Sequence, residues 1–408
     1  MKDYKLLSSC PISYSTSSVT YLDFGMMPLV NNLNNSKEES LTCPKYPLVV
    51  NYYPESQLSM LSVVVDPKIL FSNYVYKSGT SQPYIEHCKE MYDYILKFTS
   101  IKKNDWIIDI GGNDGTLLCA FLEKSKCSIN VTNIDPSENL GKISRTIGIE
   151  TLTKMWNHDV ALSMQHKYKV VVSTNVFQHT ENIRDFIRGI HHILTQDGIW
   201  CLEFPYWKKD LETNQYDQVY HEHIYYYLLT PLCNLFEQNG LEIIDVSEQK
   251  IHGGSLRIIS RIGRNRSPNP VTTKLVKEES AFNEIFYRSW GENVKKHILN
   301  SKIFLLDIKK ENKKIAAFGA AAKGCTFLNS TNINYEIINY IVDDTDTKQN
   351  KFMPGVGIQI VDRNRLIKDP PDCVVILAHN FADYIIKSVK PIYKGKFIKM
   401  FPQPIIIE

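Results

Sequence analysis

Short apolar runs separated by helix-length segments dominate the middle of the chain. Four such runs lie at residues 106–110, 129–134, 169–174 and 198–203, and a helix-like segment at 84–99 precedes the first of them. Continuous apolar runs of this length are typical of strands buried on both faces of a parallel sheet. The pattern predicts an α/β domain, which we bound at residues 76–245.

The two flanking parts follow different patterns. Residues 1–75 contain short alternating pieces, such as 18–22 and 58–61, between Pro and Asn turns, which predicts a small β-rich module. Residues 246–408 contain three further apolar runs, at 315–319, 340–343 and 373–377, which predicts a second α/β domain. The expected fold class is α/β, with a β-rich N-terminal module and two Rossmann-like domains. A chain of 408 residues is long enough for two or three domains.

Charge and composition restrict the partners. With 47 basic and 44 acidic residues the formal net charge is +3, so neither nucleic acid nor an acidic membrane surface is expected as a partner. No uninterrupted apolar run approaches eighteen residues, and Met1 leads into no signal-peptide core, which favours the cytoplasm. The nine cysteines form no C-x-x-C pair, as expected of reduced and mostly buried thiols.

The first central run ends in a glycine-rich turn that carries the clearest chemical signal. Asp109, Gly111 and Gly115 form D-x-G-x-x-x-G, and Asp135 follows the next apolar run. Glycines let a ligand lie against the backbone at a helix N-terminus, and an acid after the second strand can accept hydrogen bonds from a ribose diol. This spacing fits S-adenosylmethionine (SAM) better than the G-x-G-x-x-G of dinucleotide sites. The alternative is a βαβ unit with a tight turn and no ligand.

A second signal is the cluster Tyr220-His221-Glu222-His223, where imidazoles adjoin a carboxylate and phenols. On a helix, Tyr220 and His223 would share a face. Histidine suits proton removal near neutral pH, and Glu222 could fix its tautomer. His179, just after the 169–174 run, is expected at the same sheet edge. Zinc binding and a helix-capping polar cluster are the alternatives, although H-E-H lacks the spacing of H-E-x-x-H.

The third part contains two small-residue turns. Residues 252–257, with His252, Gly253, Ser255 and Arg257, suit an anion such as a diphosphate. Residues 319–326 nearly copy a P-loop, but Cys325 replaces its phosphate-binding lysine, which disfavours ATP hydrolysis. Lys323 in that turn could still hold a diphosphate. A structural packing turn is the alternative.

Taken together, these segments resemble one family, the three-part SAM-dependent C-methyltransferases that act on nucleotide-linked keto sugars in deoxysugar pathways. The matching stretches are 22–25, 27–29, 73–81, 109–118, 135–137, 203–206, 220–223, the two turns of the third part and 377–381. The resemblance implies an N-terminal zinc module, a central SAM domain and a C-terminal Rossmann-like domain that holds the nucleotide sugar.

One departure concerns the metal. The family's module binds zinc through two C-x-x-C pairs, whereas the corresponding residues here are Cys10 with Ser13 and Tyr53 with Ser56. Three of the four thiolates are absent, and structural zinc needs four donors. We therefore expect no zinc and no other metal site.

The resemblance also implies roles for individual residues. The implied cofactor residues are Asp109, Gly111, Gly112, Asn113, Gly115, Asp135 and Asn175. The implied catalytic group is His223 as general base with Tyr220, Glu222, His179 and Tyr76. The implied substrate contacts are Tyr74, Tyr206, His252, Gly253, Ser255, Arg257, Lys323 and Asn380.

The expected activity is methylation of the carbon next to the keto group of a dTDP-, UDP- or GDP-linked 4-keto-deoxysugar, through an enolate and with S-adenosylhomocysteine as product. A sugar O- or N-methyltransferase and a non-catalytic protein that binds SAM or a nucleotide sugar are the alternatives. An NAD-dependent oxidoreductase is disfavoured because no G-x-G-x-x-G follows a strand of the third part. We expect a monomer or a weak oligomer.

Overall fold

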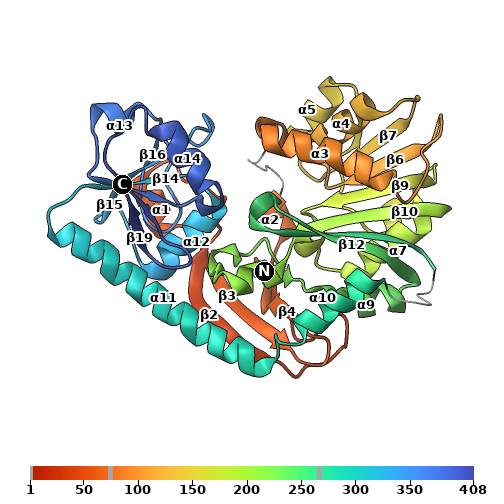
Figure 1. The fold of residues 1–408 in the computed structure, drawn as a ribbon, viewed down its shortest axis with the longest axis horizontal. Coiled ribbons are helices and arrows are strands. Elements are labelled where there is room, and N and C mark those ends of the chain that lie inside the picture. The colour runs from red at the N-terminus through yellow and green to blue at the C-terminus, as the bar shows by residue number, and fades with distance from the viewer. Residues whose placement is uncertain (1–2, 72–76, 264–268) are drawn as a thin grey trace.

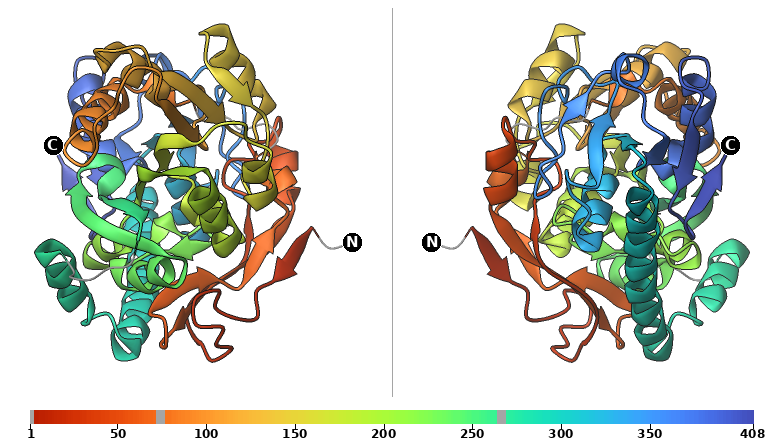
Figure 2. Two further views of the ribbon diagram at one scale, coloured as in Figure 1. Left: turned by 90° about the vertical axis from the view of Figure 1, so that its right-hand side faces the viewer. Right: turned by 90° about the vertical axis from the view of Figure 1, so that its left-hand side faces the viewer.

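The computed structural model describes residues 3–71, 77–263 and 269–408. The chain forms two α/β lobes with the N-terminal strands between them (Figure 1). The N-terminal strands lie along one side of the molecule and the C-terminus lies on the opposite side (Figure 2). The predicted α/β fold class is confirmed.

The N-terminal part is β-rich, as predicted. Its main sheet has the order β11-β4-β3-β2, and a separate antiparallel pair joins β1 to β5. The elements are β1 (Tyr4–Leu6), β2 (Val19–Pro28), α1 (Lys37–Thr42), β3 (Lys45–Tyr53), β4 (Leu58–Leu61), β5 (Val63–Val65) and α2 (Pro67–Phe71). The strand β11 (Tyr225–Tyr226) comes from the central part, so this sheet is shared between two parts of the chain.

The central part is a seven-stranded sheet of order β12-β13-β10-β9-β6-β7-β8. Five neighbouring strands are parallel, and all four predicted apolar runs form strands in it. Its strands are β6 (Trp106–Ile110), β7 (Asn130–Ile134), β8 (Glu150–Leu152), β9 (Tyr168–Thr174), β10 (Leu194–Pro205), β12 (Leu241–Gln249) and β13 (Ser255–Ile262). Its helices are α3 (Gln82–Ile95), α4 (Thr116–Lys124), α5 (Glu138–Thr146), α6 (His158–Leu162), α7 (Ile183–Ile193), α8 (Trp207–Glu212) and α9 (Leu229–Gln238).

The antiparallel edge of this sheet lies beyond the predicted domain boundary. Strand β12 pairs with β13, and β13 pairs with β10, so the sheet continues to Ile262. A boundary at residue 245 would cut through β12. The apolar pattern did not indicate this extension because both strands carry polar residues, such as Glu242 and Arg257, among their apolar ones.

The C-terminal part is a six-stranded sheet of order β16-β15-β14-β17-β18-β19, and the three predicted strands are confirmed as its centre. Its strands are β14 (Ile315–Phe318), β15 (Ile338–Val342), β16 (Ile360–Val361), β17 (Cys373–Ile376), β18 (Lys396–Lys399) and β19 (Ile405–Ile407). Its helices are α10 (Pro270–Glu279), α11 (Glu284–Lys310), α12 (Ala322–Thr331), α13 (Arg365–Lys368) and α14 (Ala382–Val389).

The long helix α11 precedes the first strand of this part and packs against the N-terminal strands (Figures 1 and 2). A Cβ atom at Gly291 would lie 2.1 Å from the carbonyl oxygen of Tyr21 in β2, so only glycine permits the observed approach of helix and strand. The Tyr287 ring packs 4.7 Å from the Tyr21 ring and 4.3 Å from the Tyr52 ring, between centroids. The three parts therefore share one continuous hydrophobic core.

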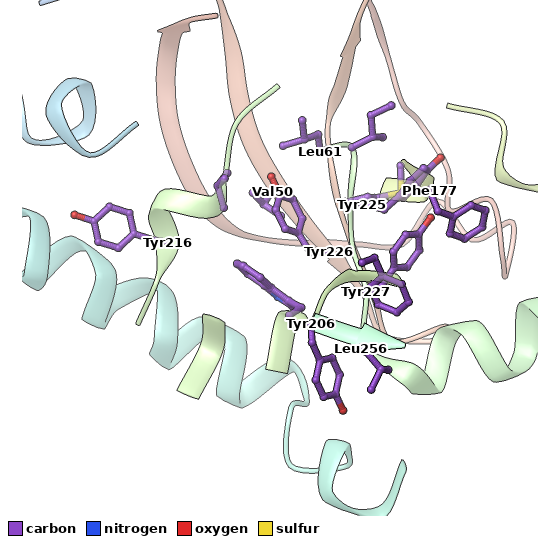
Figure 3. Packing of buried hydrophobic residues seen from close by; sticks show 14 of the residues in the cluster. Val50, Leu61, Phe177, Tyr206, Tyr216, Tyr225, Tyr226, Tyr227 and Leu256 are labelled. Atoms are coloured by element: carbon purple, nitrogen blue, oxygen red, sulfur yellow. The ribbon is translucent and has the colours of Figure 1, made fainter. Parts of the chain in front are cut away.

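Three consecutive tyrosines pack between the N-terminal sheet and the central part and so connect the core of the two. Figure 3 shows Tyr225, Tyr226 and Tyr227 between the N-terminal strands and residues of the central part. The Tyr227 ring stacks on Phe177 with 5.3 Å between centroids, and the Tyr226 ring lies 4.7 Å from Trp207. Because buried aromatic side chains contribute large apolar areas, this packing fixes the turn that precedes Tyr225.

Candidate functional site

A cavity of about 810 Å³ lies where the three parts meet. Its walls come from the loop after β6, the end of β7, the segment after β9, the turn before β11 and the start of α12. Lining residues that were predicted as site residues are Gly111, Gly112, Asn113, Asp135, Asn175, His179, Tyr220, His223, Lys323 and Asn380. The fold thus brings together residues separated by more than two hundred positions.

The glycine-rich loop is held against the sheet by short backbone contacts. Gly111 has a φ of +74°, and its N–H donates to the carbonyl oxygen of Ile134 at 2.7 Å. A Cβ atom at Gly111 would lie 2.6 Å from the Val176 side chain. At Gly112 a Cβ would lie 2.2 Å from Oδ1 of Asn133. Both positions therefore require glycine and leave the loop backbone open to a ligand.

Asp135 fixes the outer side of this loop. Its Oδ2 accepts from the N–H of Asn113 at 2.9 Å, and its Oδ1 accepts from the N–H of Ser137 at 2.8 Å. Burial raises the pKa of Asp135. Each carboxylate oxygen has a further lone pair at the cavity wall, so the side chain can still accept from a ribose diol.

Asp109 and Gly115 stand behind the loop rather than on the cavity wall. Asp109 is 1% exposed, and its Oδ1 has no hydrogen-bond partner in the described ranges. Burial and the charge of Asp135 raise the pKa of Asp109 to about 8. Gly115, with a φ of +84°, precedes the first residue of α4. The loop backbone, Asp135 and the first turn of α4 line the cavity and fit the amino acid and ribose ends of SAM, while Asp109 supports the loop from behind.

The histidine cluster lies in a turn and not on a helix. Residues 219–224 form a turn between the 3₁₀ helix Tyr216–Gln218 and β11. The turn nevertheless places the hydroxyl of Tyr220 2.8 Å from Nε2 of His223. Nδ1 of His223 lies 3.0 Å from the carbonyl oxygen of Gln218. Burial lowers the pKa of His223 well below its usual value, so the ring is neutral near pH 7.

His179 and Glu222 lie beside this pair. The His179 ring is 5.1 Å from the His223 ring between centroids, and burial lowers the pKa of His179 to about 4. Its Nδ1 donates to the backbone carbonyl of Glu222 at 2.5 Å. The Glu222 carboxylate accepts from Nδ2 of Asn31 at 2.7 Å. Glu222 therefore orients His179 through its backbone, and its carboxylate connects to the N-terminal part.

Several predicted substrate residues do not line the cavity. Arg257 in β13 is 2% exposed, and its Nε donates to Oε2 of Glu203 at 2.8 Å. Tyr206 is fully buried and donates to Oε1 of Glu279 at 2.6 Å. Ser255 is also buried in β13. Arg257, Tyr206 and Ser255 share one physical reason: strand pairing and core packing direct their side chains into the protein interior and away from the cavity.

The turn before β13 reaches the site indirectly. Gly253 has a φ of +93°, and a Cβ there would lie 2.6 Å from Nδ2 of Asn380, which lines the cavity. Tyr74 and Tyr76 lie outside the described residues, as does the side chain of His252.

The cavity also has lining residues that no motif indicated. They include Asn31, Trp156, Asn182, Asp185, Gln218 and Lys348. All of them lie in loops or near the ends of helices, where sequence patterns carry little information on which side chains converge.

The sequence predicts that the N-terminal part binds no zinc. Sγ of Cys10 lies 3.1 Å from Oγ of Ser56, both buried, where the family has zinc ligands. Residues 3–71, 77–263 and 269–408 contain no group of three or more His, Cys, Asp or Glu side chains arranged to hold a metal. The absence of zinc remains a prediction. No described helix is long and apolar enough to cross a membrane.

The sheet order and the glycine-rich loop together define a SAM-dependent methyltransferase, and comparison with known proteins confirms this class. Residues 84–246 match the family model described as a methyltransferase domain. Residues 250–402 match the one described as the C-methyltransferase C-terminal domain. The chain is 26% identical to the C-methyltransferase NovU of Streptomyces niveus, over 98% of this chain and 97% of that protein. The resemblance to C-methyltransferases is confirmed, and with it SAM as the cofactor.

Among solved structures, a SAM-dependent methyltransferase from Clostridium acetobutylicum is 11% identical with a TM-score of 0.35, over 44% of this chain and 92% of that chain. The CMeT domain of the citrinin polyketide synthase is 17% identical with a TM-score of 0.36, over 45% of this chain and 53% of that chain.

Proposed function

We propose that this C-methyltransferase acts on the carbon next to the keto group of a nucleotide-linked 4-keto-deoxysugar. The observation that carries the proposal is the hydrogen-bonded pair of Tyr220 and His223 in the same cavity as the glycine-rich loop. An O- or N-methyltransferase needs no base that can remove a carbon-bound proton. The class of sugar comes from the family resemblance.

The neutral His223 is the proposed base. Its Nδ1 faces a backbone carbonyl and so carries the ring proton, which leaves the lone pair on Nε2. That lone pair takes the proton from the carbon next to the keto group. The electrons of the C–H bond form a C=C bond, and the carbonyl π pair moves to oxygen. In the free protein this lone pair accepts from the Tyr220 hydroxyl, so that hydrogen bond has to break when the substrate carbon approaches Nε2, while the hydrogen bond from Nδ1 to Gln218 keeps the ring in place.

The cofactor end of the cavity is held by the loop. Gly111, Gly112 and Asn113 would pack against SAM, and Asp135 would bind its ribose. SAM, when bound, supplies the electrophilic methyl group for the carbanion. All three parts of the chain contribute residues to the cavity wall.

The nucleotide end is assigned to the C-terminal part. Lys348 lines the cavity there, and its Nζ lies 2.9 Å from the carbonyl oxygen of Ala320 and 3.6 Å from Oδ2 of Asp343. A partly exposed ammonium at this position suits a diphosphate. The start of α12 adds the positive end of a helix dipole.

The test uses the purified protein, SAM and freshly prepared 4-keto-6-deoxy nucleotide sugars in deuterated buffer, with mass spectrometry of the sugar. Gain of one methyl group with loss of a ring hydrogen is the expected result. A methyl group on oxygen or nitrogen, without hydrogen exchange at carbon, would contradict C-methylation. Neither methylation nor exchange across dTDP, UDP and GDP sugars, despite SAM binding, would favour a different acceptor or a non-catalytic role.

A further inference from the structure

Lys323 has an unusual environment for a lysine. It is the second residue of α12 and lines the cavity, yet its Nζ is buried and has no hydrogen-bond partner in the described part of the chain. An ammonium group has three donors, and leaving them unsatisfied in a protein interior is costly. An acceptor belonging to a bound ligand would remove that cost.

The electrostatic environment of Lys323 includes two buried acidic residues. Asp210 and Asp217 are 3% and 0% exposed, and both interact electrostatically with Lys323. Burial lowers the pKa of Lys323, and the two aspartates act in the opposite direction. Burial raises the pKa of Asp210 to about 8, whereas, against the effect of burial, the pKa of Asp217 is lowered by His379 and Lys323, so Asp217 is the carboxylate that is charged near pH 7. Asp217 is also bonded to Nε2 of His379 at 2.8 Å. The charge of Asp217 therefore favours the ammonium form of Lys323, but the donors of this ammonium have no hydrogen-bond partner among the described residues.

The position of Lys323 relative to the base distinguishes it from Lys348. The charge of Lys323 contributes to the low pKa of His223, after burial and the neighbouring His179. Three residues further along α12, Oγ1 of Thr326 donates to the carbonyl oxygen of Val219 at 3.1 Å, so this helix lies against the turn that carries His223. Lys348, in contrast, already donates to the carbonyl oxygen of Ala320 and lies beside Asp343. The diphosphate role predicted for Lys323 from the sequence fits Lys348 better.

We propose that Lys323 donates a hydrogen bond to the keto oxygen of the sugar and stabilises the enolate. This assignment rests on the proposed function. As His223 removes the carbon-bound proton, negative charge moves to the former carbonyl oxygen, where the Lys323 ammonium faces it. The ammonium keeps its proton, and no other reactant is needed. A donor that is already in place costs no reorganisation when the charge develops, and removing one such donor typically lowers a rate by about 100- to 1,000-fold.

The experiment separates this role from diphosphate binding by leaving SAM out. The full chain is incubated with the keto sugar in deuterated buffer, and exchange at the carbon next to the keto group is followed by NMR. Lys323→Met should slow exchange by about 100-fold or more. Its affinity for the matching nucleoside diphosphate, measured by calorimetry, should change by less than about threefold, or about 0.7 kcal/mol.

Lys323→Gln serves as a second variant, since it keeps a polar side chain if the methionine disturbs folding. Lys394→Met, at an exposed lysine of the same part of the chain, controls for the loss of one charge. Thermal unfolding and SAM binding verify the fold of each variant. Unchanged exchange in a folded Lys323 variant, or a loss of nucleoside diphosphate affinity of about tenfold or more, would overturn the assignment. Absence of exchange in the wild-type protein with every keto sugar would instead overturn the proposed function.

Discussion

The Tyr220 hydroxyl and Nε2 of His223 lie 2.8 Å apart, while Nδ1 of the same ring faces the carbonyl oxygen of Gln218 at 3.0 Å. A carbonyl oxygen only accepts, so Nδ1 holds the ring proton and Nε2 accepts from the tyrosine. Since burial lowers the pKa of His223, the ring stays neutral over the usual pH range. Both ring nitrogens are therefore hydrogen-bonded in the free protein, and the proposed proton removal requires the Tyr220 hydroxyl to leave Nε2.

Replacement of His223 by asparagine should remove the base and leave the cofactor site intact. We expect turnover to fall by roughly 100-fold or more, the usual effect of losing a general base. SAM affinity should stay close to that of the wild type because His223 lies outside the glycine-rich loop. Steady-state kinetics and calorimetry with SAM are the measurements. Retained turnover would assign the base to another group, such as His179 or Tyr220.

Gly111→Ala should weaken SAM binding through the loop backbone. The new Cβ would lie 2.6 Å from Val176, at a φ of +74°. The matched control is Gly148→Ala, where φ is +85° and nothing lies within 4 Å of the new Cβ. Both variants carry the strain of a positive φ, of order 1–2 kcal/mol, but only Gly111→Ala displaces the loop. We expect SAM affinity to drop by at least about tenfold in Gly111→Ala alone. Equal affinities in the two variants would contradict this view of the loop.

The glycine-rich loop could be predicted from the sequence more fully than the Tyr220–His223 pair. Strands such as Trp106–Ile110 are mostly apolar because both faces are buried, with Asp109 as the exception, and glycine is required where the backbone turns sharply. The closeness of Tyr220 and His223 was expected from a helix, and a turn produces it instead. Three residues apart, two side chains can meet in either geometry.

Contacts between distant segments could not be predicted in the same way. Asn31 and Lys348 line the cavity only because the N-terminal and C-terminal parts close around the central sheet. The pairing of β11 with β4 depends on two residues that have no pattern of their own. Arg257 was expected at the substrate because arginine after a glycine turn suits an anion, but the burial of Glu203 on the neighbouring strand determines its partner.

Arg257→Met tests that partnership. Burial would raise the pKa of Glu203, but the hydrogen bond from His87 and the charge of Arg257 lower it, so the carboxylate is charged near neutral pH. Loss of Arg257 leaves the buried Glu203 charge with only one of its two side-chain partners, His87, and the free energy of unfolding should fall by about 3–5 kcal/mol. Urea denaturation measures the change.

The double variant Glu203→Gln with Arg257→Met removes both charges and should recover part of that loss. Nucleoside diphosphate affinity of the folded single variant should change by less than about twofold. A stable Arg257→Met protein that no longer binds the nucleotide would show that Arg257 contacts the substrate after all.

The stability of the protein should depend on pH through His221, which lies outside the cavity wall. The side chain is 2% exposed, and its Nε2 lies 3.3 Å from the carbonyl oxygen of Tyr46 in β3. Burial lowers the pKa of His221 from 6.5 to about 4, against the opposing effect of that carbonyl. In the unfolded chain the imidazole takes up a proton below about pH 6.5, whereas in the folded chain it stays neutral down to about pH 4.

The folded state should therefore lose stability as the pH falls from about 6.5 towards 4, and His221 should account for about 2 kcal/mol between pH 7 and pH 5. Urea unfolding at both pH values measures the effect. His221→Phe keeps an aromatic ring beside Tyr46 and cannot be protonated. Between pH 7 and pH 5 the variant should therefore lose about 2 kcal/mol less of its free energy of unfolding than the wild type loses. His191→Gln, at an exposed histidine, should behave as the wild type does. Equal pH dependence in wild type and His221→Phe would mean that His221 is protonated in the folded protein or that its burial is compensated elsewhere.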